Sequence, residues 1–546
     1  MTHELTKLRS QTVWRTLLAA KTRVPDRNAL VGANDAGEIR RLTYETLIRR
    51  VRDVSAGLAS IGVRHGDRVV LWMTNTPEWV VASFAIMRIG AIVVPINTFL
   101  KAAEIKYLIA QSEARHVVML DAFRSLSMPE MLGEICPEFA ATTRPGCLFS
   151  SELPELRNVI ILHRCGGARR GAFDFTALEA LGSADQNARE LAQHMESESK
   201  PGDLGMIKYT SGSTSFPKGV MLEQGGIVAN AILHSRRTGI SETDVFFSMM
   251  PFFHGGGSIW GLMTMMVNGG TLVFTEAFNA TLAVDLLCRE KATVMFGVLG
   301  NEVIEVAHRK GVTLPMLRIA HVPTEDARRV MPNATFSIVP FGLTETYGPA
   351  GVSSPTDPPE KRGSSGRMLD GNECRVVDPM TGEDVSPGVA GEAWIRGNVM
   401  RGYWKKPDET KRAFTTDGWF RSEDIISMDA DGYISYVGRL KLMLKVGGEN
   451  VSIEEVERVV AAHDAVAECG AVGVPDARKG EAVRTYVAVR AGRKLDAAEL
   501  HAWLQPRLAK FKMPREIVFL DKLPRLANGK LDRLTLNERA KTEVPL

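Results

Sequence analysis

The chain is poor in the features that mark disulfide-stapled, zinc-binding and nucleic-acid-binding proteins. Its 546 residues contain 6 cysteines, at positions 136, 147, 165, 288, 374 and 469, with no Cys-x-x-Cys spacing. This scatter argues against a zinc site or a disulfide framework and fits a reducing compartment. Lys plus Arg total 67 against 64 Asp plus Glu. The net charge of +3 therefore gives no overall attraction to nucleic acid or to an anionic membrane.

The sequence also lacks a stretch that predicts a membrane span. Its longest apolar stretch, Val80 to Ile96, is interrupted by Arg88 and Gly90. The N-terminal residues are charged and contain no signal-peptide core. A hydrophobic content of 45% and a charged content of 24% are ordinary for a globular chain. We therefore expect a soluble, cytoplasmic protein with more than one domain.

Strand and helix signals alternate through most of the chain. Predicted helices cover residues 43–61, 78–88 and 101–112, and predicted strands cover 67–73 and 91–95. This rhythm is typical of parallel sheets packed between helices. Near residue 365 the pattern changes to short strands separated by Gly, Pro and Asp turns, which predicts a β-rich subdomain.

A second, smaller unit is predicted after residue 438. Ser452 with Glu455 predicts a capping box for a helix that ends near His463. Strands at 471–474, 483–489 and 516–520 and a helix at 496–508 complete a compact α+β module. The predicted fold class is α/β. Residues 1–438 form a large N-terminal domain of mixed sheets layered with helices plus the β-rich subdomain, and 439–546 form a small C-terminal α+β cap domain.

The segment from Tyr209 to Gly219 carries the strongest chemical signal. It reads Tyr-Thr-Ser-Gly-Ser-Thr-Ser-Phe-Pro-Lys-Gly and follows an apolar run that begins at Leu204. Hydroxyls, exposed backbone N–H groups and Lys218 suit the binding of a polyphosphate. The loop is not a Walker A motif, because Pro217 precedes the lysine and an apolar run follows it. A surface turn rich in Ser and Gly is the alternative for this composition.

Two segments suit the remaining parts of a nucleotide. In Phe341–Thr346, an adenine could stack on Phe341, Thr344 could bind phosphate and Glu345 could hold Mg²⁺. The alternative is a structural turn. The carboxylate of Asp424 could accept both ribose hydroxyls, and Arg439 could reach the same ribose or a phosphate. A surface acid and a linker charge are the alternatives.

Three further positions have a binding and a structural interpretation. The glycine turn within Lys445–Asn450 suits close approach of a ligand or a partner domain, or is only the bend before the next helix. Lys530, on an Asn-Gly turn, is by itself most simply a solvated charge. His254 precedes a glycine triplet and is either a core histidine or a residue at the rim of an acyl pocket.

These motifs and their order resemble the adenylate-forming superfamily of acyl-CoA synthetases, luciferases and adenylation domains. The resemblance covers nearly the whole chain, from about Thr12 to Lys530. Further matching stretches are Asn75–Glu78, Gly90–Pro95, Gly363–Arg367, Gly391–Glu392 and Gly402–Pro407. One such stretch could be an accident, but so many in the same order could not.

The resemblance implies a two-step reaction. A carboxylate attacks the α-phosphorus of ATP to give an acyl-adenylate and pyrophosphate, and the thiol of coenzyme A then displaces AMP. The first step brings one anion onto another, so catalysis is mainly charge neutralisation and positioning. The implied cofactors are ATP, Mg²⁺ and coenzyme A.

The resemblance also assigns residues to roles. The implied nucleotide- and CoA-binding residues are Thr210, Ser211, Gly212, Ser213, Thr214, Lys218, Phe341, Gly342, Thr344, Glu345, Asp424, Arg439, Gly447, Gly448 and Glu449, with Glu345 as the metal ligand. The implied catalytic residues are Lys530, His254 and Lys441. Lys530 would bridge the carboxylate and the α-phosphate. Lys441 would be the hinge about which the small domain swings, exchanging Lys530 for the turn at 447–449 in the closed site.

The chain departs from the family pattern at three places. Leu442 replaces the usual acidic residue after the hinge, Ser215 and Phe216 change the phosphate loop, and residues 321–324 replace a small Gly-Gly-Ala-Pro-like stretch. The last change leaves the pocket shape open.

The expected substrate is a hydrophobic carboxylic acid: fatty, alicyclic or aryl, in that order. The candidate pocket wall is Phe252, Phe253, Trp260, Met263, Met265, Met266 and Phe296, with space at Gly297. We expect no charged side chain there to match a polar tail, although Asp244 lies close enough in sequence to leave an anchor for an amino group open.

Two other functions remain open at this stage. One is the loading of a carrier-protein phosphopantetheine; because no carrier domain is seen to follow Leu546, CoA is the favoured acceptor. The other is nucleotide binding without turnover. No nucleic-acid partner is expected, and a homodimer is left open.

Overall fold

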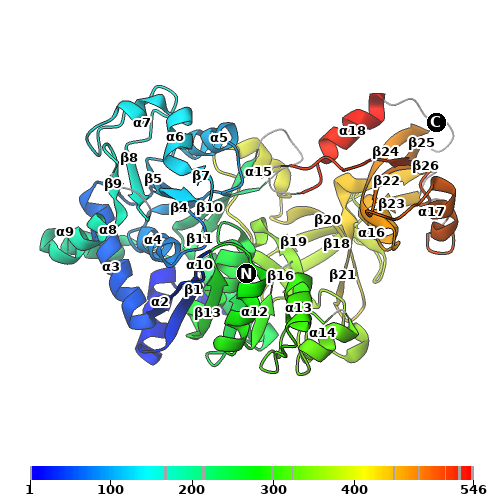
Figure 1. The fold of residues 1–546 in the computed structure, drawn as a ribbon, viewed down its shortest axis with the longest axis horizontal. Coiled ribbons are helices and arrows are strands. Elements are labelled where there is room, and N and C mark those ends of the chain that lie inside the picture. Colours follow the sequence, from blue (N-terminus) through cyan, green and yellow to red (C-terminus); the bar gives the residue numbers. More distant parts are fainter. Residues whose placement is uncertain are drawn as a thin grey trace. The chain divides into compact units, whose positions relative to one another are not determined.

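The computed structural model describes residues 3–164, 169–210, 217–296, 300–322, 324–446, 449–476, 480–508, 510, 512–526 and 530–542. The chain forms two compact units, one of residues 1–374 with 395–420 and the other of 375–394 with 421–546 (Figure 1). The predicted boundary after residue 438 lies inside the second unit. As a division between a main domain and a cap, it stays a prediction.

A seven-stranded sheet organises the first unit. Its strands, in spatial order, are β11 (Lys218–Glu223), β10 (Leu204–Thr210), β4 (Ile92–Pro95), β3 (Arg68–Trp72), β5 (His116–Leu120), β8 (Asn158–Leu162) and β9 (Phe173–Asp174). All neighbours are parallel except β10 and β11, which form an antiparallel hairpin at one edge. The inner strands are buried on both faces, as their continuous apolar sequences require.

Two further sheets complete the first unit. The five-stranded sheet has the order β14 (Val294–Phe296), β12 (Val245–Ser248), β13 (Thr271–Thr275), β1 (Asn28–Ala33) and β2 (Ile39–Thr43). Only β2 is antiparallel to its neighbour. The three-stranded sheet is antiparallel and has the order β15 (Pro340–Leu343), β16 (Gly348–Val352) and β17 (Arg367–Met368).

Helices with side-chain caps connect these strands. The predicted helices and strands of the first hundred residues are confirmed: α3 (Tyr44–Ser60), α4 (Pro77–Arg88) and α5 (Ala102–Ser112) alternate with β3 and β4. The hydroxyls of Thr43 and Thr76 accept hydrogen bonds from the first-turn amides of α3 and α4. The other helices of this unit are α1 (His3–Leu8), α2 (Val13–Arg23), α6 (Met128–Ile135), α7 (Pro137–Ala141), α8 (Phe175–Ala184), α9 (Gln186–Glu198), α10 (Gln224–Thr238), α11 (Thr264–Asn268), α12 (Ala280–Arg289), α13 (Gly300–Arg309), α14 (Glu325–Val330) and α15 (Pro407–Ala413).

The helix α10 lies deep in the first unit, buried along nearly its whole length. It begins directly after β11, the strand whose first residue is Lys218. A β-carbon at Gly226 would come within 2.2 Å of the Tyr347 ring, so only glycine fits there. Tyr347 has a φ of 63°, in the left-handed region, and its hydroxyl accepts a hydrogen bond from the Glu223 amide at 3.1 Å.

The β-rich texture predicted after residue 365 is confirmed by a four-stranded sheet. Its order is β18 (Glu373–Val377), β19 (Ala390–Arg396), β20 (Phe420–Met428) and β21 (Ile434–Arg439). The turn between β20 and β21 is closed by Asp429, whose carboxylate accepts from the amides of Asp431 and Tyr433 at 3.0 and 2.9 Å.

The C-terminal part forms a five-stranded sheet with three helices. The strands are β22 (Met443–Val446), β23 (Glu449–Ser452), β24 (Val466–Asp476), β25 (Gly480–Val489) and β26 (Glu516–Phe519), and the helices are α16 (Ile453–Ala461), α17 (Ala497–Leu504) and α18 (Arg533–Thr542). The predicted cap is confirmed, because the Ser452 hydroxyl accepts from the Glu455 amide at 3.2 Å. The predicted α/β fold class, with a large and a small domain, is correct. No helix in the described ranges is long and apolar enough to cross a membrane.

Candidate active site

The β10–β11 hairpin holds both ends of the proposed phosphate loop. Thr210 pairs with Lys218 at the open end of the ladder, and the predicted residues Ser211, Gly212, Ser213 and Thr214 lie outside the described residues. The Tyr107 hydroxyl of α5 donates to the Pro217 carbonyl at 3.1 Å. The Tyr209 hydroxyl is hydrogen-bonded to Gln111, also on α5. The strand pairing and α5 thus fix where this loop starts and ends.

Tyr403 joins the two strongest predicted residues of the first unit. Its hydroxyl donates to Glu345 Oε1 at 2.9 Å, and its ring lies beneath the Lys218 ammonium at 4.6 Å. Lys218 Nζ also lies 3.5 Å from Glu409 Oε2 on α15. A cation and a carboxylate predicted from separate motifs therefore share one aromatic neighbour. Sequence reasoning noted the stretch around Tyr403 as matching the family but gave it no role.

A short segment around Tyr403 covers the free edge of β11. The Trp404 amide donates to the Gly219 carbonyl at 2.7 Å, and the Met221 amide donates to the Gly402 carbonyl at 3.0 Å. Val220 and Tyr403 form an antiparallel bridge between them. This pairing places the Tyr403 side chain beside the residue that begins β11.

Glu345 is a suitable ligand for a hard cation. It lies on a 3₁₀ turn, Thr344–Thr346, and is 8% exposed. Its Oε1 is bound by Tyr403, and no described residue is hydrogen-bonded to its Oε2. No group of three or more His, Cys, Asp or Glu side chains suited to a metal gathers within the described ranges. A Mg²⁺ ion here would therefore be held by one carboxylate together with phosphate oxygens and water, the arrangement Mg²⁺ favours.

The other residues of the Phe341–Thr346 motif have structural explanations beside the predicted ones. Phe341 is 3% exposed, and a β-carbon at Gly342 would meet the Gly348 carbonyl oxygen at 2.1 Å. The Thr346 hydroxyl accepts from the Leu343 amide at 2.9 Å and fixes the turn. Thr344 is half-buried on the same turn. Adenine stacking on Phe341 stays a prediction.

His254 is an exposed residue of the turn that precedes a π-helix, Gly256–Met263. Its backbone carbonyl accepts from Ser258 Oγ at 2.9 Å, and its imidazole lies against the Phe253 ring at 4.6 Å between centroids. The buried Asn75 side chain accepts from the Phe252 amide of the same turn at 2.8 Å. An exposed imidazole on a fixed turn fits the predicted pocket rim better than a core position.

The expectation that no charged side chain lies at the apolar wall is wrong. Lys208 on β10 is 3% exposed and donates from Nζ to the Phe253 carbonyl at 3.0 Å. Burial lowers the pKa of this amine to about 7. The other residues of the predicted wall are apolar, and the Trp260 and Phe296 rings are in contact, with centroids 3.9 Å apart and planes tilted by 40°.

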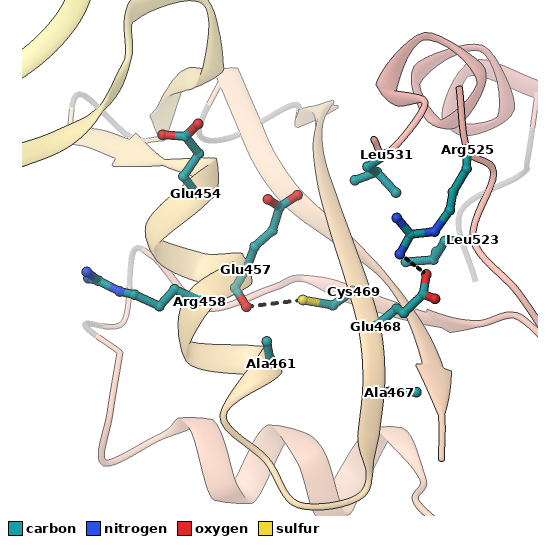
Figure 2. Close-up of a pocket in the computed structure, with 10 residues that line it drawn as sticks. All are labelled: Glu454, Glu457, Arg458, Ala461, Ala467, Glu468, Cys469, Leu523, Arg525 and Leu531. Atoms are coloured by element: carbon teal, nitrogen blue, oxygen red, sulfur yellow. Dashed lines mark hydrogen bonds and ion pairs between the residues drawn. The ribbon is translucent and has the colours of Figure 1, made fainter. Parts of the chain in front are cut away.

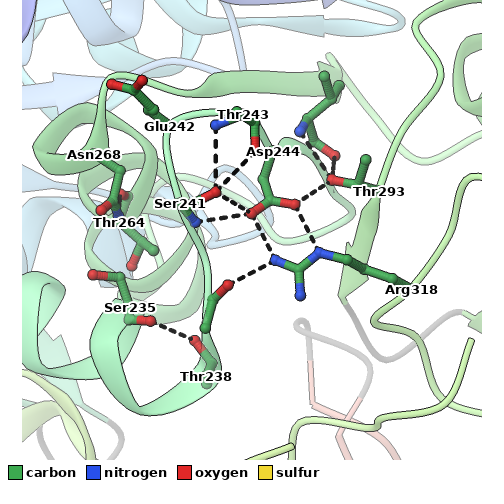
Figure 3. A network of polar contacts seen from close by, with 12 residues as sticks. Ser235, Thr238, Ser241, Glu242, Thr243, Asp244, Thr264, Asn268, Thr293 and Arg318 are labelled. Carbon is green, nitrogen blue, oxygen red and sulfur yellow. Dashed lines mark hydrogen bonds and ion pairs between the residues drawn. The ribbon is translucent and has the colours of Figure 1, made fainter.

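Asp244 is not free to anchor an amino group of a substrate. Its carboxylate accepts from Arg318 at 2.6 and 3.0 Å and from the Thr293 hydroxyl at 2.7 Å (Figure 3). It also accepts from the Ser241 amide at 2.8 Å, and the arginine holds the pKa of this carboxyl below its usual range. The carboxylate is thus satisfied within the fold and ties β12 to the next strands.

Asp424 and Arg439 come together in the second unit. They are paired residues of β20 and β21, and Arg439 Nε donates to Asp424 Oδ1 at 2.6 Å. Asp424 is 4% exposed, which excludes the surface-acid alternative. An aspartate held by an arginine on a strand has a fixed direction, as a residue binding a ribose diol needs. The ribose role itself stays a prediction.

The remaining predicted residues of this unit are placed only in part. Lys441 lies in a 3₁₀ turn, Leu440–Leu442, and Leu442 packs against the C-terminal hydrophobic core. Glu449 begins β23, and Gly447 and Gly448 lie outside the described residues. Lys530 is exposed, and its carbonyl accepts from the Leu526 amide at 2.8 Å. The hinge and catalytic roles of Lys441 and Lys530 stay predictions.

A groove of about 390 Å³ opens near Lys530, lined by Glu457, Glu468, Cys469, Arg525 and Leu531 among others (Figure 2). Two of its carboxylates are paired with arginines: Arg525 lies 2.9 Å from Glu468, and Glu457 is bound to Arg533. Burial raises the pKa of the Cys469 thiol to about 12, so that thiol is unreactive. The groove does not gather catalytic groups.

Two family models match the chain. The model described as AMP-binding enzyme matches residues 18–404, and the model described as AMP-binding enzyme C-terminal domain matches residues 455–530. The chain belongs to the AMP-binding enzyme family. The resemblance to the adenylate-forming superfamily is thereby confirmed.

Relatives of this family member are acyl-CoA ligases. It is 31% identical to a Mus musculus protein named Medium-chain acyl-CoA ligase ACSF2, mitochondrial, over 100% of this chain and 90% of that protein. It also matches ATP-bound MatB from Rhodopseudomonas palustris with a TM-score of 0.76 and 26% identity, over 97% of this chain and 99% of the other. The anthranilate CoA ligase AuaEII, in complex with anthranoyl-AMP, shares its fold with a TM-score of 0.80 and 24% identity, over 97% and 98% of the two chains.

These findings identify an enzyme, an AMP-forming acid–thiol ligase of the acyl-CoA synthetase type. ATP and CoA are the cosubstrates that the family and the ATP-bound relative imply. Two functional candidates were missed from sequence. Tyr403 could have been found from its place in the matching Gly402–Pro407 stretch, and Lys208 from being the one charge in the run before the phosphate loop.

Proposed function

We propose that this ligase activates a largely hydrophobic carboxylic acid with ATP and transfers the acyl group to CoA. The observation that carries the proposal is the Tyr403 link between Lys218 and Glu345. Lys218, which would bind the triphosphate, and Glu345, which would hold its metal ion, contact the same tyrosine side chain. Both are needed at once where an anionic acid attacks an anionic phosphate.

Each residue of the first unit has a task in that step. The hairpin presents the residue 210–218 loop, whose N–H and hydroxyl groups would donate to the β- and γ-phosphates, and Lys218 would add a point charge. Glu345 would hold Mg²⁺, which supplies further neutralisation of phosphate charge when bound. Tyr403 keeps the Glu345 carboxylate in one orientation. His254, on its fixed turn, would border the acid and exclude water from it.

The second unit would supply the ribose contacts and the change between half-reactions. Asp424, oriented by Arg439, would accept the ribose hydroxyls. Lys530 would bridge the carboxylate and the α-phosphate during adenylation. Rotation about Lys441 would then replace Lys530 by the turn at 447–449 for the attack of the thiol. The apolar Leu442 beside the hinge is anchored in the core of this unit, where an acidic residue would be solvated.

The apolar wall favours a medium-chain, alicyclic or aryl acid. The predicted wall consists of aromatic and methionine side chains, and the name of the mouse relative specifies medium-chain acids. Aromatic and methionine side chains adapt to irregular apolar groups. Asp244 is paired with Arg318, so its carboxylate offers no anchor for the α-amino group of an amino acid.

The test is the release of pyrophosphate and AMP over a panel of carboxylic acids, with and without CoA. We expect rapid AMP release only when a medium-chain or aryl acid and CoA are both present. AMP release that needs a carrier protein in place of CoA would support the carrier-loading alternative. No release with any acid would contradict the proposal and favour binding without turnover.

A further inference from the structure

Lys208 is a buried amine that the proposed reaction does not use. Its residue is 3% exposed, and its Nζ makes one hydrogen bond, to the Phe253 carbonyl at 3.0 Å. A lysine ammonium has three donors, so further donors have no acceptor among the described residues. Among the described residues no carboxylate shifts its pKa, which burial lowers to about 7. Such uncompensated burial is rare for lysine outside functional sites.

Lys208 lies between two parts of the candidate site, the strand that leads into the phosphate loop and the turn that carries His254. Successive side chains of β10 alternate between its faces, so Lys208 and Thr210 share one face. Ile207 and Tyr209 occupy the other, where both lie within 3.4 Å of the β-carbon position of Gly219. The acceptor, Phe253, directly precedes His254. The amine therefore lies where the strand of the phosphate loop meets the turn of the acid pocket.

We propose that Lys208 is a specificity-determining residue that binds a second oxygen function on the carboxylic acid. The substrate class is then an apolar acid that also carries a hydroxyl, oxo or second carboxylate oxygen. This inference rests on the proposed function and narrows it.

The reasoning follows from the partners of the amine. Every other residue of the candidate wall is apolar, so an unsubstituted hydrocarbon chain would leave the remaining donors of Lys208 without an acceptor. An oxygen on the acid would satisfy them. A pocket built to bond a substrate oxygen discriminates strongly against the analogue that lacks it, whereas an apolar wall discriminates weakly.

A purely structural role gives a different expectation. If Lys208 only held the Phe253 carbonyl in place, its replacement would impair the site equally for every acid. A specificity role changes the ratio between oxygenated and unsubstituted acids. The two roles are therefore separated by a ratio rather than by a loss of activity.

The experiment measures kcat/KM for AMP release by the full-length enzyme with ATP, CoA and matched medium-chain acids. Each chain length is tested as the unsubstituted, hydroxy, oxo and dicarboxylic form, which also separates the three sources of oxygen. We expect one oxygenated form to exceed its unsubstituted partner by about tenfold or more. We expect Lys208→Met, which keeps the apolar stem, to reduce that preference by about tenfold.

The controls keep each outcome decisive. Lys200→Met removes an exposed lysine eight positions earlier and should leave the preference unchanged. Equal loss for all acids in Lys208→Met, or a wild-type preference for every unsubstituted acid, overturns the inference while leaving the proposed function intact. No AMP release with any acid overturns both. If the Lys208 variant does not fold, the kcat/KM ratio of oxygenated to unsubstituted acids in the wild-type enzyme still supports or overturns the inference.

Discussion

Tyr403 contacts both Lys218 and Glu345, the predicted phosphate-binding cation and metal-binding carboxylate of the first unit. Its hydroxyl fixes one oxygen of Glu345, while its ring contributes a cation–π contact to Lys218. The two contacts use different parts of the side chain. They can therefore be removed separately.

Replacing Tyr403 with Phe keeps the ring and removes the hydroxyl. We expect the rate of ATP–pyrophosphate exchange to fall about tenfold, because a hydrogen bond to a charged group is lost. We also expect the half-saturating Mg²⁺ concentration to rise, since the Glu345 carboxylate is no longer held. Tyr403→Leu, which also removes the ring, should weaken ATP binding further. An unchanged Mg²⁺ requirement in Tyr403→Phe would contradict the metal role of Glu345.

Lys208 should make the stability of the protein depend on pH in a defined window. Its pKa falls from 10.5 to about 7 on folding, so between these values the unfolded chain binds more protons than the folded one. The cost of burying this amine is thus complete below pH 7 and declines as pH rises toward 10.5. We expect Lys208→Met to raise the melting temperature at pH 6.5 and to raise it less at pH 9. An equal change at both pH values would show that the amine does not titrate in this window.

For single residues, the sequence predicted the charged side chains of the candidate site but not the residues that contact them. Lys218 and Glu345 were predicted from local motifs, and the structure brings them together. Lys208 was counted within an apolar run, because its hydrogen-bond acceptor, the Phe253 carbonyl, comes 45 positions later. The bond from Tyr403 to Glu345 joins residues 58 positions apart, and no periodicity reports such a contact.

Among the elements, α10 shows how backbone proximity positions the site. Its second and third residues are glycines, and the helix begins where β11 ends. Gly225 lies against the Arg9 carbonyl and Gly226 against the Tyr347 ring. The helix can therefore approach the turn that carries Glu345 more closely than one with side chains there.

Gly226→Ala tests that packing. Alanine favours a helix over glycine by about 1 kcal/mol, but its β-carbon would overlap the Tyr347 ring. We expect a net loss of about 1–3 kcal/mol in the free energy of unfolding, measured by urea denaturation. Gly133→Ala on α6 meets no atom within 4 Å and should be neutral or stabilising. Similar behaviour of the two variants would contradict the close contact.

Elements with a strong hydrophobic pattern were predicted well. The helix at 453–461 has its cap and a clear apolar face, with Ile453, Val456 and Val460 buried. By contrast, α18 was missed, because only Leu536 and Ala540 of its residues are buried, and the others are exposed or polar, the apolar Leu534 included among the exposed ones. A helix held by two apolar contacts leaves little periodicity to detect.

For the whole molecule, the division of labour between the two units is the central expectation. We expect the first unit to supply the groups that bind the phosphates, the metal ion and the acid, and the second to supply the ribose-binding pair and Lys530. Each unit has its own hydrophobic core, so each can keep its fold when the other is altered.

Lys530→Ala tests the alternation between half-reactions. We expect adenylation, measured as ATP–pyrophosphate exchange, to fall about a hundredfold or more, because a cation at the reacting oxygens is lost. Formation of the CoA thioester from preformed acyl-adenylate should be almost unchanged. The exposed Lys522 offers a matched control, and Lys522→Ala should affect neither step. Comparable losses in both half-reactions would refute the exchange of Lys530 for the 447–449 turn.

The pairing of residues 401–404 along β11 has an evolutionary consequence. Side chains on paired strands alternate, so an insertion or deletion of one residue in this segment would turn the Tyr403 side chain to the opposite face. Lys218 and Glu345 would lose their common neighbour although every motif remained legible. Members of this family that carry such a length change should be poor catalysts of adenylation, and their sequences alone would still pass for active enzymes.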